Sequence, residues 1–170
     1  RLQTEGLAAA LADPEVAEAL VKGQVALAIF QWSGTKQQIL VLPWQRMLSD
    51  PDVTRFAARA AAAPRAFQGS DTAVGEGIRF AAAQFAAVPD CRRKVIDISG
   101  DGQENAGFTD ALARSEAIGQ GLSINAIAIV LVQLGELGTL DTTLVVLGAG
   151  LSLLVFGMHV AMRFIARDAD

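Results

Sequence analysis

Residues 94–105 read KVIDISGDGQEN, an apolar run followed by a loop of small and acidic residues. The apolar run predicts a strand that is buried inside a sheet. Asp101 stands in the loop between two glycines, which let the backbone turn sharply. In an open parallel sheet, ligands bind at the carboxyl ends of the strands. Asp101 is therefore the first candidate for a functional residue.

The sequence before this stretch predicts two helices and a hairpin. The first part of the chain is rich in Ala, Leu and Glu, and Asp13-Pro14 divides it into two helices, with Asp13 as the N-cap of the second. Residues 24–34 and 37–47 predict strands. Pro43 cannot donate to a ladder, so the second strand is expected at a sheet edge. The short connection predicts that the two strands form an antiparallel hairpin.

From residue 49 to residue 132 the sequence predicts two helices, followed by a strand, a helix and a second strand. Asp50 is the expected N-cap of the first of these helices and Thr109 that of the last. One face of the first helix is apolar, at Val53, Phe56, Ala57 and Ala60. The whole set comprises helices within residues 49–64, 69–89 and 109–121, and strands at residues 93–99 and 122–132.

This alternation predicts an α/β fold with a doubly wound, mostly parallel sheet and one antiparallel edge strand. Helices are expected on both faces of the sheet. Residues 1–132 would form one domain, and residues 133–141 would be a linker or loop.

The composition excludes several classes of function. The chain has 170 residues, which suits one domain, and a net charge of -4 with only 14 Lys and Arg, which argues against nucleic-acid binding. Its single cysteine and single histidine allow neither an internal disulfide nor a Cys/His zinc site. Cys91 is expected to be structural, and the alternative is a reactive thiol activated by the cationic residues 92–94. The chain begins at Arg1 with no apolar signal segment before the first helix, so we expect a fragment or a processed product.

Known calcium, nucleotide and acid–base motifs fit the acidic loop only in part. An EF-hand loop starting at Asp97 needs a bidentate Glu where this chain has Phe108. The dinucleotide fingerprint needs a glycine where this chain has Asn105. Asp97 and Asp101 are an alternative acid–base pair, but no nucleophile–base pair supports an enzyme. Asp97 lies in the middle of the strand and is expected to hydrogen-bond to neighbouring backbone.

Several motifs in the same order give the chain a family resemblance. The stretch RKVIDISGDG, preceded by SDTAVGEGIRFAAAQF, resembles a von Willebrand factor type A domain. The chain is more closely similar to a bacterial family of domains of unknown function, number 1194. This similarity rests on LQTEG in the first helix, WSG after the first predicted strand and PW in the next strand. The resemblance covers roughly residues 1–129.

The resemblance implies a Rossmann-like three-layer sandwich with a metal-ion-dependent adhesion site at the strand ends. Such sites draw on an Asp-x-Ser-x-Ser loop, a Thr and an Asp. Thr72 matches the second element and Asp101 the third, and Ser70 is a neighbour that could take part. The implied ion is Mg²⁺, completed by a carboxylate from a protein partner. The first loop and its central strand are expected to lie before Arg1, so the sheet should lack its first central strand and the site should be partial.

The last part of the chain, residues 142–165, has two readings. Residues 142–162 hold no charged residue, and a transmembrane helix needs about 20 apolar residues. Asp141 precedes this stretch, whereas Arg163 and Arg167 follow it. This bias would place the C-terminus in the cytoplasm and the domain on the periplasmic or extracellular face.

The alternative reading makes the tail part of the domain. Residues 142–150 would form its last strand and residues 155–169 its closing helix. The Gly-Ala-Gly and Ala-Met-Arg runs in these segments resemble the end of the family's domains.

Three functions follow as hypotheses. The first is a non-enzymatic binding or adhesion module that recognises a protein partner through the partial metal site. The second is a membrane-anchored structural component without a metal. The third is a metal-dependent hydrolase that uses Asp97 and Asp101. The resemblance favours the first.

Overall fold

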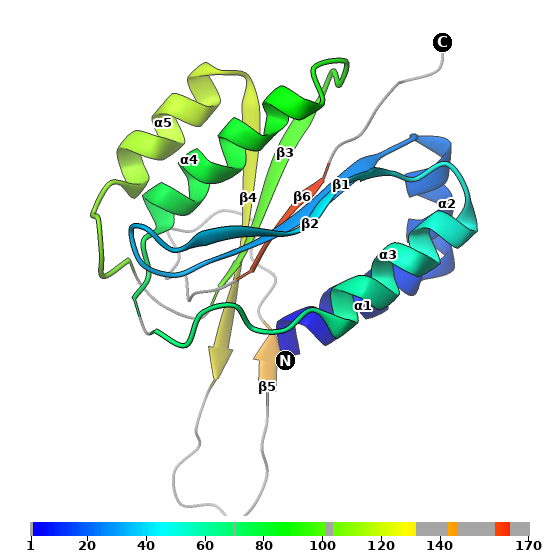
Figure 1. Cartoon of the computed structure of the whole chain (residues 1–170), viewed down its shortest axis with the longest axis horizontal. Helices are drawn as coiled ribbons and strands as arrows, with labels where there is room; N and C mark the ends of the chain where they lie inside the picture. The colour runs from blue at the N-terminus through cyan, green and yellow to red at the C-terminus, as the bar shows by residue number, and fades with distance from the viewer. Residues whose placement is uncertain (1, 70, 101–103, 132–142, 146–158, 164–170) are drawn as a thin grey trace, which may run out of the picture.

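The computed structural model describes residues 2–69, 71–100, 104–131, 143–145 and 159–163. Its helices are α1 (Leu2–Ala12), α2 (Pro14–Lys22), α3 (Asp50–Ala62), α4 (Val74–Gln84) and α5 (Asp110–Gly119), with a short 3-10 helix at Phe85–Ala87. Its strands are β1 (Ala26–Trp32), β2 (Gln38–Arg46), β3 (Lys94–Gly100), β4 (Leu122–Leu131), β5 (Thr143–Val145) and β6 (His159–Arg163). The fold is therefore of the mixed α/β class, as predicted (Figure 1).

The strands form a sheet in the order β2-β1-β6-β3-β4-β5. β3 and β4 are parallel, and β6 is antiparallel to both β1 and β3, so β1, β3 and β4 point in the same direction. β2 is antiparallel to β1, and β5 is antiparallel to β4. The expectation of one antiparallel strand is therefore wrong, because β5 and β6 also run against the parallel set. A short connection such as residues 132–142 returns the chain antiparallel, whereas a parallel return needs a longer crossover.

Helices cover both faces of the sheet, and two neighbouring residues of β1 demonstrate this. The ring of Phe30 lies 5.3 Å from that of Phe80 in α4. The next residue, Gln31, donates to the carbonyl of Pro64 (2.8 Å) and accepts from the amide of Ala66 (2.7 Å), both just after α3. Adjacent side chains of a strand point to opposite faces. α3 and α4 therefore lie on opposite faces, and every residue of β1 is buried between them (Figure 1).

The predicted hairpin is confirmed. β1 and β2 pair from Ala26 with Arg46 to Trp32 with Gln38, and β2 ends the strand order. The register shifts between Leu27 and Phe30, opposite the part of β2 that contains Pro43. A bulge at this point accommodates a residue that has no amide hydrogen.

Strand β6 fills the place where the sequence predicted a missing central strand. It pairs with β1 from Leu27 to Phe30 and with β3 from Val95 to Ser99. Both readings of the tail placed a helix over His159–Arg163, and this prediction is wrong. The buried centre of a sheet leaves backbone N–H and C=O groups that need partners, and this requirement outweighs the helix propensity of a short Ala-Met-Arg run.

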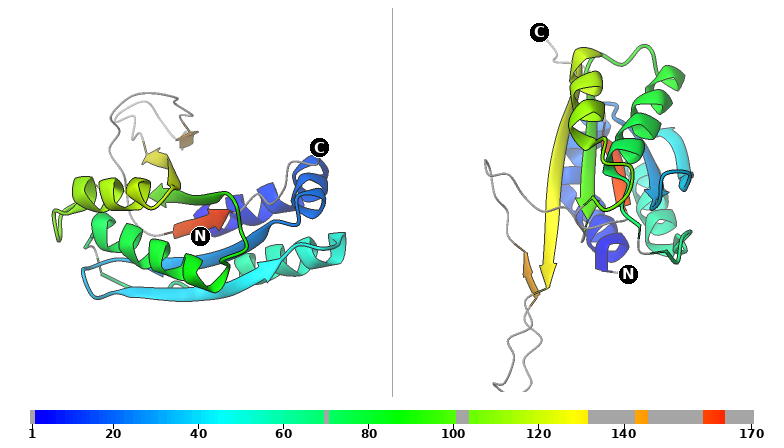
Figure 2. Two further views of the ribbon diagram at one scale, coloured as in Figure 1. Left: turned by 90° about the horizontal axis from the view of Figure 1, so that it is seen from above. Right: turned by 90° about the vertical axis from the view of Figure 1, so that its left-hand side faces the viewer.

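The rest of the tail is described in part. β5 lies within the predicted final strand, and Figure 2 shows it at the far end of β4, beyond the helices. The described residues do not include 132–142, 146–158 and 164–170. Most of the predicted membrane span and the whole predicted linker fall in these ranges. Among the helices that the structure does describe, none has the length and apolar character needed to cross a bilayer.

Local predictions for the first helices hold with one correction. The boundary between α1 and α2 lies at Asp13, as predicted. The carboxylate of Asp13 accepts from the amides of Glu15 (2.9 Å) and Val16 (3.2 Å) at the start of α2. The N-cap of α3 is Ser49 rather than Asp50. Its hydroxyl donates to the carboxylate of Asp52 (2.7 Å) and makes no capping bond to a backbone amide. The predicted apolar face of α3 is buried at all four positions, Val53, Phe56, Ala57 and Ala60.

Cys91 is buried, as the structural reading of this residue predicts. Burial is the largest cause that raises the pKa of its thiol above the ordinary value, and the charge of Asp90 adds to it. A thiol with a raised pKa is a poor nucleophile, which disfavours the alternative of a reactive cysteine.

Candidate functional site

Three connections meet at the carboxyl ends of β1 and β3. The first follows β1, where the hydroxyl of the buried Ser33 donates to the carbonyl of Asp71 (2.8 Å). The amide of Ala73 donates to the carbonyl of Ser33 (2.8 Å). These bonds hold residues 71–73, which lead into α4, against the end of β1.

The connection from β3 to α5 is attached to the same segment. The amide of Thr72 donates to the side-chain oxygen of Asn105 (2.7 Å). The carbonyl of Thr72 accepts from the amides of Asn105 (3.0 Å) and Ala106 (3.3 Å). The loop that follows β3 and the segment that contains Thr72 are therefore fixed to each other at the strand ends.

The structure places one of the three predicted site residues. Thr72 is buried, with 5% of its surface exposed, at the expected edge of the sheet. Asp101 and Ser70 lie outside the described residues. Asp101 directly follows Gly100, the last residue of β3, so its loop begins at this edge. Thr72 directly precedes Ala73, which is the N-cap residue of α4.

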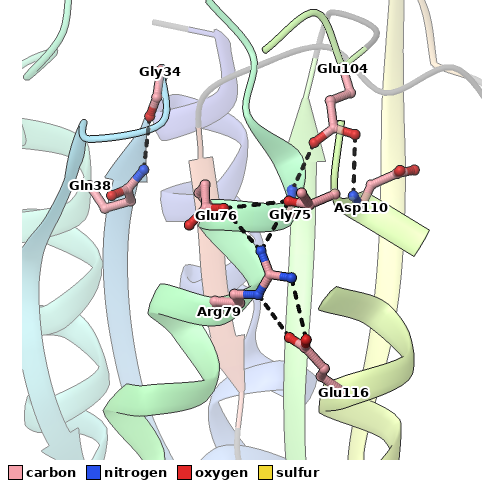
Figure 3. A network of polar contacts seen from close by, with 9 residues as sticks. Gly34, Gln38, Gly75, Glu76, Arg79, Glu104, Asp110 and Glu116 are labelled. Atoms are coloured by element: carbon pink, nitrogen blue, oxygen red, sulfur yellow. Dashed lines mark hydrogen bonds and ion pairs between the residues drawn. The ribbon is translucent and has the colours of Figure 1, made fainter. Parts of the chain in front are cut away.

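Glu104 joins the beginnings of α4 and α5, and sequence reasoning missed it. One carboxylate oxygen accepts from the amide of Gly75 (3.1 Å) and the other from the amide of Asp110 (3.2 Å) (Figure 3). Neither Ala73 nor Thr109, the N-cap residues, caps its own helix with a side chain. Thr109 is therefore at the predicted position without the predicted capping bond. Glu104 lies six residues before Asp110, outside the range of the local capping motifs that a sequence displays.

Gly75 allows the two helix starts to approach closely. A Cβ atom at this position would lie 2.3 Å from the Thr109 hydroxyl oxygen and 2.6 Å from the Thr109 carbonyl carbon. The sequence does contain a signal for this contact, because glycine destabilises a helix relative to alanine and stands out inside a helical pattern. Gly77 has a similar role, since its Cβ would lie 3.1 Å from the ring of Trp32.

An ion-pair network continues the contact between α4 and α5. Arg79 donates to Glu116 (2.8 Å), Glu76 (3.0 Å) and the hydroxyl of Thr109 (3.0 Å) (Figure 3). The hydrogen bond from Arg79 lowers the pKa of Glu116, and the bond to Glu116 raises the pKa of Arg79. The guanidinium thus has carboxylate partners on both helices, which suits a structural bridge.

Asp97, the other acidic residue of the alternative enzyme hypothesis, is paired within the sheet. Its carboxylate accepts from the side-chain amide of Asn125 (2.7 Å), the residue opposite it in β4. The carboxylate is therefore hydrogen-bonded within the sheet, here by a side-chain donor, whereas the prediction named backbone partners. The parallel register of β3 and β4 sets this pair.

The described residues contain no group of three or more His, Cys, Asp or Glu side chains that could hold a metal ion. Of the candidate ligands named from the sequence, Thr72 is described, whereas Asp101 and Ser70 lie outside the described set. Glu104 and Asn105 already direct their side-chain oxygens at amide hydrogens.

One comparison with known proteins finds a family. The model of the family described as "Protein of unknown function (DUF1194)" matches residues 1–150, which is most of the chain. The searches of curated proteins and of solved structures gave no match.

Proposed function

Since the chain belongs to the DUF1194 family, whose function is unknown, we propose a function from the geometry of its strand ends. The protein is a non-enzymatic binding module of the von Willebrand factor type A kind. It recognises a protein partner through a Mg²⁺ ion held at the carboxyl ends of β1 and β3, with Thr72 and Asp101 as ligands. Ser70 is a further candidate for the same site.

The observation that carries this proposal is the attachment of Asn105 to Thr72. Two residues that lie far apart in the sequence, Thr72 and Asp101, belong to connections that these hydrogen bonds bring together. The sheet supports the same proposal, because β1, β3 and β4 share one direction and β2 is an antiparallel edge strand. Ligands of such sheets bind at this edge.

The chemistry of the available groups suits Mg²⁺. Magnesium prefers oxygen ligands in octahedral geometry and usually keeps several waters when one or two carboxylates bind it. Thr72 offers a hydroxyl and Asp101 a carboxylate, and waters and the carboxylate of a partner would complete the shell. With so few ligands from the chain, we expect weak binding of Mg²⁺ alone.

The proposed partner is a protein that presents a carboxylate to the ion. β5 and β6 place residues 143–145 and 159–163 in the sheet, so a membrane span over residues 142–162 is not proposed. A periplasmic or extracellular location is part of the same proposal. Cell fractionation of the tagged chain checks it, because recovery in the cytosol would contradict this location.

A Mg²⁺ titration of the 170-residue chain, followed by amide NMR shifts, tests the metal site. We expect saturable shifts at Thr72 and Gly75 that disappear in Asp101→Ala. Asp50→Ala removes an exposed carboxylate from the first turn of α3 and serves as the matched control. No response in the wild-type chain, or an unchanged response in Asp101→Ala, would overturn the proposal.

Two further results would replace this function with another. Turnover of a phosphate monoester that is lost in Asp101→Ala would favour the hydrolase hypothesis. Membrane pelleting without any response to Mg²⁺ would favour the structural component.

A further inference from the structure

Strand β6 joins two parts of the sheet that share no other strand pairing among the described residues. β2 and β1 form one part, and β3, β4 and β5 form the other. β6 lies between them and pairs with residues 27–30 of β1 and residues 95–99 of β3 (Figure 1). A segment that fills this central position, between β1 and β3, completes the sheet through backbone hydrogen bonds, which need no particular side chains.

The sequence of β6 fits the central position poorly. A strand with both faces covered is usually a continuous run of Val, Ile and Leu. β6 (His159–Arg163) reads HVAMR, which has an ionisable residue at each end and a single β-branched residue. Arg163 is in register with Leu27 and Val95, which are only 5% and 3% exposed. Backbone pairing therefore holds β6 in surroundings that do not favour its sequence.

β6 is also shorter than the strands on either side of it. β1 and β3 have seven residues each, whereas β6 has five. The pairing of β6 with β1 stops at Phe30, so Gln31 and Trp32 extend beyond it. Trp32 is buried, and its indole N–H has no hydrogen-bond partner in the described part of the chain. A buried donor without an acceptor is unfavourable, so this end of the central position lacks a group that it needs.

These features define a segment that would fit the central position better than β6. Residues directly opposite each other on paired strands have their side chains on the same face, with Cβ atoms about 5 Å apart. A segment that continues past Phe30 would therefore place one side chain beside the indole of Trp32. A hydroxyl there would accept from the indole N–H, and apolar side chains would suit the positions opposite residues 27–30.

We infer that β6 is a replaceable strand and that the central position takes up an extended segment of a partner protein. This segment spans residues 27–32 of β1, with apolar side chains opposite residues 27–30 and a hydroxyl opposite Trp32. In strand addition of this kind, backbone bonds supply affinity and side-chain positions supply specificity. β6 must leave first, and its poor fit makes that step less unfavourable. The segment needs no metal ion, so this recognition is separate from the proposed Mg²⁺ site.

A cross-strand disulfide tests the inference in the 170-residue chain. Ile29 and Ala161 are directly paired, so the double variant Ile29→Cys/Ala161→Cys allows a disulfide that locks β6 to β1. The native Cys91 is buried and stays unchanged. The wild-type chain, treated with the same oxidant and reductant, is the control for the treatment itself.

The probe is a fluorescent synthetic peptide, KKGSVVAMVF, derived from residues 157–164. It carries two added lysines for solubility and the changes Met158→Ser, His159→Val and Arg163→Val. In the register of β6, its serine lies opposite Trp32 and its last valine opposite Leu27. A second probe has alanine in place of this serine.

Fluorescence anisotropy compares binding of the probe to the oxidised and the reduced double variant. We expect the dissociation constant to fall at least tenfold on reduction, because β6 can leave its position only when it is not locked. The wild-type chain should bind the probe equally under both treatments. The alanine probe should bind about fivefold more weakly than the serine probe, the usual effect of one hydrogen bond.

His159→Val/Arg163→Val makes the same improvement in the chain's own strand. We expect a higher urea concentration at the midpoint of unfolding and at least tenfold weaker binding of the probe, because the improved β6 competes better for the central position. A lower midpoint would show that the natural sequence of β6 suits its place, which contradicts the inference.

Four further results would overturn it. Equal binding to the oxidised and reduced double variant would place the probe elsewhere on the protein. A lack of binding to the reduced form would show that β6 does not give way to a better-fitting strand. Disulfides between two chains at low protein concentration would make a second copy the occupant, in place of a partner protein. If no disulfide forms, β6 is not paired with β1 as the inference requires.

Discussion

The first backbone amides of α2 and those of α4 and α5 find their side-chain acceptors in different ways. α2 is capped locally by Asp13, whose carboxylate accepts from amides two and three residues later. α4 and α5 are capped from a distance by Glu104, a residue of the loop between β3 and α5. The cap of α2 concerns one helix, whereas Glu104 ties two helices and a strand end together.

The difference shows where the candidate site derives its shape. A local cap stabilises its helix wherever that helix lies. A remote cap works only if β3, α4 and α5 are already in place, so it couples their positions. The strand ends that we propose as a metal site are built from contacts of this second kind, which include the bond from Ser33 to Asp71 and those between Thr72 and Asn105.

The largest expected effect comes from Gly75→Ala. The new Cβ would meet Thr109 at 2.3 Å, and both the side-chain oxygen and the backbone of Thr109 are involved, so α4 and α5 must separate. We expect a loss of about 3 kcal/mol in the free energy of unfolding, as for overpacked sites. Urea unfolding measures it.

Gly119→Ala is the control for this substitution, because a Cβ at Gly119 meets nothing within 4 Å. It should be neutral or stabilise α5 by up to about 1 kcal/mol. Equal losses in the two variants would show that the close approach of the helix starts is not a constraint.

The second prediction compares the two kinds of cap directly. Asp13→Ala should cost about 1 kcal/mol, the usual value for one N-cap. Glu104→Ala should cost roughly 2 kcal/mol, because it leaves the first turns of two helices without their acceptor. Chemical denaturation of both variants measures the difference. A smaller loss for Glu104→Ala than for Asp13→Ala would contradict the role of Glu104 as a shared cap.

A smaller effect is expected at two residues with a positive φ angle. Phe108, just before α5, has φ 51°, and Gln24, just after α2, has φ 46°. The left-handed conformation costs a non-glycine residue roughly 1–2 kcal/mol, and glycine loses roughly 0.5–1 kcal/mol in entropy on folding. Phe108→Gly and Gln24→Gly should each therefore raise stability by about 0.5 kcal/mol. A loss at Phe108 alone would reveal a packing role for a side chain that is 77% exposed.

The smallest effect is a pH dependence between α4 and α5. The hydrogen bond from Arg79 lowers the pKa of Glu116 below its ordinary value of 4.5. The stabilisation is therefore present above pH 4.5 and disappears as the pH falls through the lowered pKa in the folded state. Glu116→Gln should be slightly less stable than the wild type at neutral pH and should match it in strong acid.

Unfolding midpoints at several pH values check this prediction, and added salt should reduce the difference because the pair is partly exposed. A difference between the two proteins that does not change with pH would contradict the ion-pair explanation.

Much of the fold can be predicted from short sequence patterns. Pro43 indicates the edge strand, Asp13-Pro14 the break between α1 and α2, and the apolar spacing of α3 its buried face. Each of these predictions depends on the chemical structure of one or two residues or on the spacing of apolar residues along one helix. The contact at Gly75 is an intermediate case, because a glycine within a helix indicates that something approaches without saying what.

The antiparallel β6 could not be predicted in the same way. Its residues suit a helix, a membrane span or a strand, and their position depends on unpaired backbone groups of β1 and β3. Glu104 presents the same difficulty, since nothing near it in the sequence distinguishes it from other acidic loop residues.

By itself, therefore, the sequence determined the helices α1–α5, the strands β1–β4, the hairpin and the loop that follows β3, because those depend on interactions between near neighbours. Only the tertiary structure decided which strand lies between β1 and β3, and which carboxylate caps α4 and α5. It also decided that the loop after β3 is attached to Thr72. These outcomes depend on hydrogen-bonding groups that must find partners across the fold, and such partners exist only when the chain has closed around them.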